Sequence, residues 1–383
     1  MAAGYQLDQF GLMVDCEPRM AAYAEALKRA VTPGCTVIDI GAGFGIFSLL
    51  ACKYGAREVV AIEPDPSVEL VLPIARANGF ADRITVIRDL STRFTPERKA
   101  DVLVSDIRGV TPLFQHHIPT IIDARERLLA PGGHQIPLRD RIVIAPVHAP
   151  RHYLPCERPW LANNFALDLT EGHRFVVNIP AAARLDREAI MAEPQSLAVL
   201  DYRTITNTDV DSTVEFTTDR PATCHGFLVW FEAEIAEGLG FSNGPGEAEL
   251  VYPQYFLPLE RPLTLHAQQP VSARVSARLI DGDYIWSWET FVEGSSTGDA
   301  TQRFSQSSFK GKIFSPQNLK PLANNHIPEM TEAMAIDRDC LSLVGEERDL
   351  QEIASCIFER HTEHFESEAH ALVHVARVLK RYR

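Results

Sequence analysis

Residues 37–63 read VIDIGAGFGIFSLLACKYGAREVVAIE, and this stretch decides the fold. The run 37–40 is short, apolar and rich in β-branched residues, which is typical of a buried parallel strand. The glycine-rich segment 41–45 predicts a sharp turn, and 46–54 has the spacing of a helix. A second strand is expected at 59–62. The order strand, glycine turn, helix and strand predicts a Rossmann-like α/β domain.

The glycine turn and the acid at the end of the second strand together indicate a nucleoside-containing ligand. Gly41 and Gly43 let the backbone approach a ligand without an intervening Cβ. Glu63 is placed to accept hydrogen bonds from both hydroxyls of a ribose. A dinucleotide fingerprint has the spacing G-x-G-x-x-G, whereas this turn reads G-x-G-x-G with Asp39 two residues before it. A nicotinamide enzyme and a βαβ unit without a ligand are the alternatives.

This pattern resembles the first motif of class I S-adenosylmethionine-dependent methyltransferases. The resemblance implies that the methyl donor, S-adenosylmethionine, is the cofactor and that no metal is required. It also implies a set of donor-binding residues: Asp39, Gly41, Ala42, Gly43, Glu63 and Pro64.

The composition narrows the class of protein further. A chain of 383 residues with 45% hydrophobic content is expected to form two or three domains. No apolar run is long enough for a membrane span and no signal peptide is evident, so we expect a cytoplasmic protein. Seven cysteines without C-x-x-C spacing argue against a disulfide framework and a zinc site. A net charge of −14 argues against nucleic acid as a partner and would suit a cationic substrate, although acidic surfaces often only aid solubility.

The texture of the sequence changes near residue 140. Residues 1–140 have the alternating helices and strands of the methyltransferase domain, whereas 141–314 contain short β-like runs separated by Pro, Gly and Asn. These runs are 142–147, 175–179, 213–217, 226–233, 270–279 and 285–292. They predict an antiparallel barrel or sandwich. Residues 315–335 are expected to be a linker that overlaps an irregular stretch from 295 to 332, and residues 336–383 are expected to be a helical C-terminal module.

A Rossmann-like methyltransferase followed by a β-barrel is the plan of the protein arginine methyltransferases, which the chain resembles over residues 5–314. The resemblance implies that Arg19, in the N-terminal helix, binds the methionyl carboxylate through its planar guanidinium. It places Asp89 and the backbone of Leu90 at the adenine, and Ser105 at the end of the strand that leads to the acceptor loop. A solvated Arg19 and a capping role for Asp89 are the alternatives.

The acceptor loop departs from the family. In arginine methyltransferases two glutamates, nine positions apart, bind the target guanidinium. Here the two positions hold Asp106 and the uncharged Gln115, with Arg108 between them. One carboxylate supplies about half of the charge-assisted hydrogen bonds of two. We therefore expect Asp106 to orient or deprotonate a different acceptor, and Arg108 to hold an acidic group on it.

Two further candidates come from the barrel and from the acceptor loop. The family's Thr-His-Trp loop corresponds to residues 250–255, where Tyr252 replaces the Trp as an aromatic wall and Val251 replaces the His. In the pair His116-His117, His117 is our candidate proton acceptor. A metal pair and a plain loop are the alternatives.

The leading prediction is therefore a methyltransferase with arginine-methyltransferase-like architecture and a non-standard acceptor, either a small molecule or a peptide. The alternatives are an arginine N-methyltransferase acting on free arginine or a peptide, and a non-catalytic protein that keeps the donor fold as a scaffold. The intact glycine loop and ribose acid favour an enzyme over a scaffold.

Two predictions concern partners. Residues 345–354 resemble the turn and helix of small PqqD-like peptide-binding modules, which implies a leader peptide as a partner; a plain helical cap is the alternative. Relatives with this architecture form head-to-tail dimers. Residues 151–169 concentrate apolar side chains, Trp160 among them, in a segment that we expect to be irregular and to need a cover. We therefore predict a homodimer.

Overall fold

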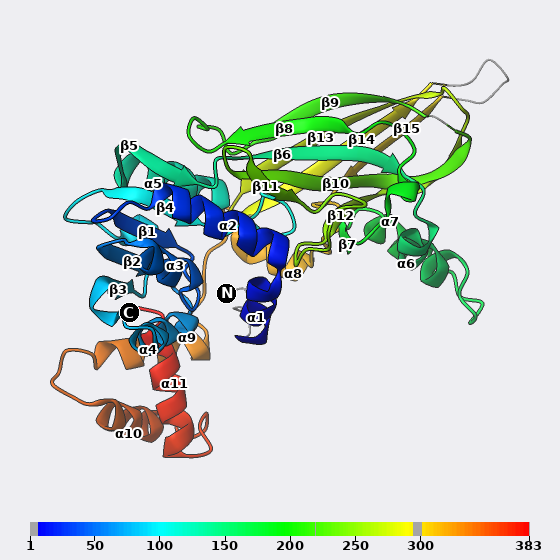
Figure 1. Ribbon diagram of the computed structural model, residues 1–383. Coiled ribbons are helices and arrows are strands. Elements are labelled where there is room, and N and C mark those ends of the chain that lie inside the picture. The colour runs from blue at the N-terminus through cyan, green and yellow to red at the C-terminus, as the bar shows by residue number, and fades with distance from the viewer. Residues whose placement is uncertain (1–6, 219, 294–300, 383) are drawn as a thin grey trace. The chain divides into compact units, whose positions relative to one another are not determined.

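The computed structural model describes residues 7–218, 220–293 and 301–382 (Figure 1). Residues 1–6, at the N-terminus, and 294–300, in the irregular stretch, lie outside the described residues. Contacts divide the chain into two compact units, Met1–Ile313 and Phe314–Arg383. Within the described ranges, every helix is too short or too polar to cross a lipid bilayer.

The first unit contains the predicted parallel sheet, with strand order β3-β2-β1-β4-β5. Its strands are β1 (Thr36–Ile40), β2 (Glu58–Ile62), β3 (Ile84–Ile87), β4 (Ala100–Ser105) and β5 (Leu129–Ile136). All five residues of β1 are buried, because helices cover both faces of a parallel sheet. The fold class predicted from the glycine motif is therefore confirmed for this part of the chain.

Helices and short 3₁₀ turns connect these strands. They are α1 (Leu7–Asp15), α2 (Glu17–Ala30), α3 (Ile46–Tyr54), η1 (Pro66–Leu70), α4 (Val71–Ala77), η2 (Ala81–Arg83), η3 (Ser91–Arg93) and α5 (His117–Arg127). The predicted helix at 46–54 is α3, and Gly55 ends it in the left-handed conformation with φ 111°. Helix α2 packs against α3 and also against the antiparallel strands (Figure 1). It therefore links the two halves of the first unit.

The antiparallel strands form two sheets. One has the order β7-β12-β10-β6-β8, with β11 paired to β10, and the other has the order β15-β14-β13-β9. The strands are β6 (Arg139–Val147), β7 (Ala181–Ala183), β8 (Gln195–Asp201), β9 (Val210–Thr217), β10 (Ala222–Ala236), β11 (Leu239–Ser242), β12 (Gln254–Leu265), β13 (Pro270–Ile280), β14 (Asp283–Val292) and β15 (Gln302–Ser307). One core that includes Phe227, Leu257 and Trp288 draws on both sheets. Among the described residues, no strand pairing closes the two sheets into a barrel.

Three local predictions were wrong. The run 175–179 is not a strand, because helix α7 (Thr170–Val176) extends into it. A short apolar run does not distinguish a strand from a buried helical turn. The expected irregular segment begins with helix α6 (Pro150–Leu161), whose Trp160 ring packs against the backbone of Gly172. The irregular stretch after residue 295 contains strand β15.

The second unit is a small helical module. It comprises α8 (Pro316–Leu319), η5 (Lys320–Leu322), α9 (Glu332–Ser342), α10 (Leu350–Arg360) and α11 (Glu368–Lys380). Ile336, Ile357 and Val375, one from each of the three longest helices, are fully buried in its own core. Asp349 and Glu352 form a reciprocal capping box at the start of α10. The predicted helices of this C-terminal segment are therefore present.

Candidate functional site

A cavity of about 780 Å³ opens at the carboxyl ends of β1, β2 and β4. Ligands of open α/β sheets bind at this edge, where the loops after the strands meet. The wall is built from helix α1, the glycine turn, the acceptor loop and Tyr252 of the antiparallel half. Of the predicted site residues, eleven line this cavity: Arg19, Gly41, Ala42, Glu63, Pro64, Asp89, Leu90, Asp106, Arg108, Gln115 and Tyr252.

Two neighbouring side chains lie very close to the backbone of the glycine turn. Gly41 has φ 73°, and a Cβ there would lie 2.2 Å from Cγ2 of Ile107 in the acceptor loop. Gly43 has φ 54°, and its Cβ would lie 2.7 Å from Cε1 of Phe10 in α1. Only glycine satisfies both the backbone conformation and the space. The glycine turn therefore packs tightly against the acceptor loop at Gly41 and against α1 at Gly43.

Glu63 organises the loop from the end of β2. Its Oε2 accepts a hydrogen bond from the Gly43 N–H at 3.1 Å, and its Oε1 accepts one from the Asp65 N–H at 2.9 Å. Burial raises the pKa of this carboxyl, and the two N–H donors partly oppose the rise. Each oxygen keeps a lone pair for a further donor, such as a ribose hydroxyl.

Asp39, Gly43 and Ser105 lie behind the cavity wall. The Oδ2 of Asp39 accepts hydrogen bonds from the Ser48 N–H at 2.9 Å and the Ser48 hydroxyl at 2.7 Å. Burial raises the pKa of Asp39 to about 7. The carbonyl of Ser105 accepts the Tyr23 hydroxyl at 3.0 Å. Asp39 therefore joins the end of β1 to α3, and Ser105 joins β4 to α2.

The segment after β3 forms another side of the cavity. Asp89, Leu90, Ser91 and Thr92 line it, and Leu90 is 47% exposed. The Oδ1 of Asp89 accepts the Leu90 N–H at 2.7 Å and lies 3.4 Å from Arg93. Asp89 thus shapes the turn while facing the cavity.

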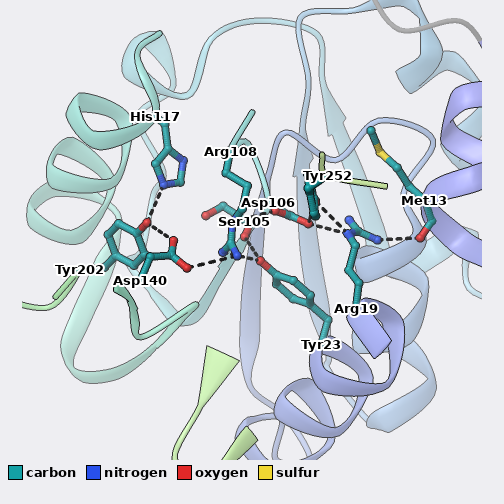
Figure 2. A network of polar contacts seen from close by, with 10 residues as sticks. All are labelled: Met13, Arg19, Tyr23, Ser105, Asp106, Arg108, His117, Asp140, Tyr202 and Tyr252. Carbon is teal, nitrogen blue, oxygen red and sulfur yellow. Dashed lines mark hydrogen bonds and ion pairs between the residues drawn. The ribbon is translucent and has the colours of Figure 1, made fainter. Parts of the chain in front are cut away.

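Arg19, Asp106 and Tyr252 meet at one end of the cavity (Figure 2). Arg19 Nε donates to Oδ2 of Asp106 at 2.6 Å, and the Tyr252 hydroxyl donates to the same oxygen at 2.7 Å. Arg19 Nη1 donates to the Met13 carbonyl at 3.0 Å. Burial works to raise the pKa of Asp106, but Arg19 and Arg108 hold it below its usual value. Asp106 is therefore a charged, weakly basic carboxylate.

Arg108 is buried in a different role from the predicted one. Its Nε lies 3.3 Å from Oδ1 of Asp106, its Nη1 lies 3.3 Å from Oδ1 of Asp140, and its side chain has no exposed surface. Its Nη2 donates to the Tyr23 hydroxyl at 3.2 Å. The guanidinium also lies 5.3 Å from the ring centroid of Phe231. Its charge is thus paired with two internal carboxylates, although Arg108 lines the cavity.

His117 also lies away from the cavity. Its Nε2 hydrogen-bonds the Tyr202 hydroxyl at 3.0 Å, and that hydroxyl donates to Asp140 (Figure 2). Burial, reinforced by Arg108, lowers the pKa of His117 to about 3, so the ring is neutral at physiological pH. The neighbouring His116 lines the cavity instead. Gln115, between His116 and Phe114, has the unusual φ of 41° at the cavity wall.

The sequence did not predict the residues that hold Arg108 and His117 in place. Asp140 and Tyr202 lie in and just after strands of the antiparallel half, 62 residues apart from each other. They carry no local motif, so only the tertiary fold brings them to Arg108. Phe10 and Met13 of α1 also line the cavity and were not among the predicted site residues. The apolar residues of the segment 7–15 were the available signal.

Comparison with known proteins agrees with this geometry. Residues 21–136 match the family model described as ribosomal protein L11 methyltransferase (PrmA), and residues 143–289 match the arginine methyltransferase oligomerization subdomain. Among curated relatives, an arginine N(omega)-methyltransferase from Streptomyces achromogenes subsp. streptozoticus is 29% identical over 278 residues, covering 70% of this chain and 74% of the relative. The probable protein arginine N-methyltransferase 6 of Arabidopsis thaliana is 25% identical over 233 residues, covering 58% of this chain and 53% of the relative.

Solved structures share the architecture at low sequence identity. The Trypanosoma brucei PRMT1 enzyme-prozyme complex with AdoHcy has a TM-score of 0.71 at 19% identity, covering 78% of this chain and 97% of that chain. Arabidopsis thaliana protein arginine methyltransferase 10 has a TM-score of 0.69 at 18% identity, covering 79% of this chain and 97% of that chain. At this identity the likeness establishes the fold.

The parallel sheet, the glycine turn and the family match over residues 21–136 make this part of the chain similar to class I S-adenosylmethionine-dependent methyltransferases. More particularly, the antiparallel half that follows matches the arginine methyltransferase oligomerization subdomain, so the two halves together are similar to the protein arginine methyltransferases.

Proposed function

We propose that the protein transfers the methyl group of S-adenosylmethionine to an acceptor other than a guanidinium, on a small molecule or a peptide. The observation that carries this proposal is the state of Asp106. This carboxylate is held between Arg19 and Arg108, and 1% of its side chain is exposed. The second family position is the uncharged Gln115.

The cavity residues fit the methyl donor. Glu63 offers two carboxylate oxygens for the ribose, and the turn at Gly41 and Ala42 offers backbone. Arg19 uses Nε and Nη1 for protein contacts, and its Nη2 remains to pair with the methionyl carboxylate. The donor supplies a methyl group activated by a sulfonium. Because Arg19 also bonds Asp106, donor binding and the acceptor loop are coupled through one ion pair.

A guanidinium acceptor would meet a carboxylate that two arginines already pair with. Arg19 and Arg108 together carry two positive charges against the one negative charge of Asp106, and the second negative charge, on Asp140, lies on the far side of Arg108. A further cation beside them would be repelled, because like charges at short range are costly away from water. A neutral nucleophile avoids this repulsion.

The second candidate is an arginine N-methyltransferase acting on free arginine or a short peptide. The similarity to the Streptomyces arginine N(omega)-methyltransferase favours it. In that case an incoming guanidinium would have to replace Arg108 or Arg19 as the ion-pair partner of Asp106. That exchange would move a buried ion pair into an unpaired state, which costs several kcal/mol by order of magnitude.

The two candidates are separated by one labelling experiment. The purified protein is incubated with S-adenosylmethionine labelled in the methyl group and one of three samples: L-arginine, an arginine- and glycine-rich peptide, or an extract of the source organism. We expect label in a component of the extract and none in arginine or the peptide. Labelling of arginine as efficient as that of any extract component would overturn the proposal. A protein that purifies without S-adenosylhomocysteine and labels nothing would favour the non-catalytic scaffold.

Two partner proposals complete this function. We propose a cytoplasmic homodimer, with α6 and the following segment to residue 169 at the interface. Phe165, which is 80% exposed, and Leu167, which is 61% exposed, support an apolar contact there. We also propose a leader-peptide partner for the C-terminal helices, on the strength of the resemblance at residues 345–354.

A further inference from the structure

His116 is a titratable side chain at the cavity that the donor site does not use. It is exposed, it lines the cavity, and it follows Gln115 in the loop between β4 and α5. Its carbonyl accepts the Thr120 N–H at 2.9 Å, which fixes its backbone at the start of α5. The imidazole is therefore attached to the start of a helix, and it lines the cavity.

The other titratable groups of the cavity wall are committed elsewhere. Glu63, Asp65 and Asp89 accept backbone N–H groups at the ends of β2 and β3, on the ribose and adenine side. Asp106 is tied to two arginines and to the Tyr252 hydroxyl. Burial and the neighbouring Asp106 raise the pKa of Tyr252, so its hydroxyl stays protonated. Among the described lining residues, His116 is the base that these contacts leave available.

The antiparallel half holds the ring in position. A Cβ on Gly282 would lie 2.8 Å from His116 Nε2, so the imidazole packs directly on this glycine. Gly282 sits in the turn between β13 and β14, with φ 84°. The carboxylates of Asp281 and Asp283 flank it in sequence. The β13–β14 turn thus contacts the His116 ring directly.

We propose that His116 is the general base of the reaction, which rests on the proposed methyl transfer. The acceptor carries its nucleophile as a neutral N–H or O–H group. As the bond from the nucleophile to the methyl carbon forms, the carbon–sulfur bond breaks and its electron pair stays on sulfur. The proton of the nucleophile passes to His116, and the resulting imidazolium releases it to solvent. An imidazole ring nitrogen with a free lone pair can accept this proton.

The first test is a comparison of variants in single-turnover reactions. The probe is whichever of the three labelling samples becomes methylated by the wild-type protein. We expect His116→Ala to slow S-adenosylhomocysteine formation about 10²- to 10⁴-fold. Its calorimetric affinity for S-adenosylhomocysteine should stay within about twofold of the wild type, and added imidazole should restore part of the rate. An unchanged rate in His116→Ala, or a loss of rate accompanied by an equal loss of affinity for S-adenosylhomocysteine, would overturn the proposal.

A matched pair of glycine variants tests the position of the ring. Gly282→Ala introduces a Cβ against His116, whereas Gly238→Ala, in the β10–β11 turn with φ 69°, meets no atom within 4 Å. Both impose similar backbone strain. We expect only Gly282→Ala to lower the single-turnover rate, by about tenfold or more. Equal rates in the two variants would contradict the role of the contact.

A chemical readout tests contact with the acceptor without turnover. Diethyl pyrocarbonate should modify His116 in the free protein, and S-adenosylhomocysteine together with the methylated sample should protect it. The buried His117 is the internal control and should stay unmodified. Equal modification of His116 with and without these ligands would overturn the proposal. Labelling of arginine would overturn the proposed function but leave the His116 tests valid, whereas label in no sample would overturn both.

Discussion

Nε of Arg108 lies 3.3 Å from Oδ1 of Asp106, and 1% or less of either side chain is exposed. This pair joins the acceptor loop to the antiparallel half, because the same guanidinium also contacts Asp140 in β6. On the other side Asp106 contacts Arg19 in α2. The four alternating charges of Arg19, Asp106, Arg108 and Asp140 therefore connect α2, at the cavity, to the antiparallel sheet that contains β6.

Arg108→Met should destabilise the protein strongly. Removing one partner of a buried ion pair leaves uncompensated charges and costs about 3–5 kcal/mol. Arg274→Met is the matched control, because the pair of Arg274 with Asp211 is exposed to solvent and should contribute little to stability. Urea unfolding measures both. Arg108→Met combined with Asp140→Asn should recover part of the loss, and a loss near that of the control would refute the role of the network.

Glu63→Gln should weaken binding of S-adenosylhomocysteine about tenfold, equivalent to about 1.4 kcal/mol, because a carboxylate that accepts hydrogen bonds is replaced by a neutral amide. Calorimetric titration is the measurement. Glu69→Gln is the control, because its side chain is 68% exposed and pairs with Arg88. Affinity unchanged in Glu63→Gln would remove this residue from the donor site.

Gly41→Ala should abolish measurable donor binding, because its Cβ would collide with Ile107. Gly34→Ala carries a similar positive φ of 89° with no atom within 4 Å and should bind normally. Adding Ile107→Ala to Gly41→Ala removes the colliding atom and should restore part of the affinity. Equal binding by the two single variants would show that the close approach does not matter.

His117 should make stability depend on pH in the acid range. Its pKa is lowered from 6.5 to about 3 in the folded protein, so only the unfolded chain binds this proton between those values. Stability is therefore complete above pH 6.5 and falls as the pH drops toward 3, with a slope approaching about 1.4 kcal/mol per pH unit. His117→Gln should flatten this dependence in urea unfolding from pH 7 to 4. An identical pH dependence in the two proteins would contradict a neutral buried ring.

Phe165→Glu should weaken self-association by at least about tenfold, because it places a charge in the proposed apolar interface. Ile280→Glu is the control, since Ile280 is a 52% exposed apolar residue on β13, outside this segment. Sedimentation at micromolar concentration distinguishes a dimer from the 42.7 kDa monomer. A monomeric wild-type protein would remove the dimer proposal altogether.

Local chemistry in the sequence determined the donor half of this protein. The β-branched run before the glycine turn, the turn itself and the acid at Glu63 specify a strand, a tight loop and a strand end within 27 consecutive residues. Such a unit depends on backbone conformation and on hydrogen bonds between near neighbours, so its residues reveal it without the rest of the chain. The alternation of short strands after residue 140 likewise predicted antiparallel sheets.

Only the tertiary structure decided the acceptor half. The sequence placed Arg108 and His117 at the acceptor, but the fold buries both against Asp140 and Tyr202, which come from the antiparallel half. It brings His116 to the cavity and Gly282 to His116 across 166 residues of sequence. The charge available at the site depends on which long-range partners neutralise each side chain. That pairing is a property of packing between sheets, and no local pattern encodes it.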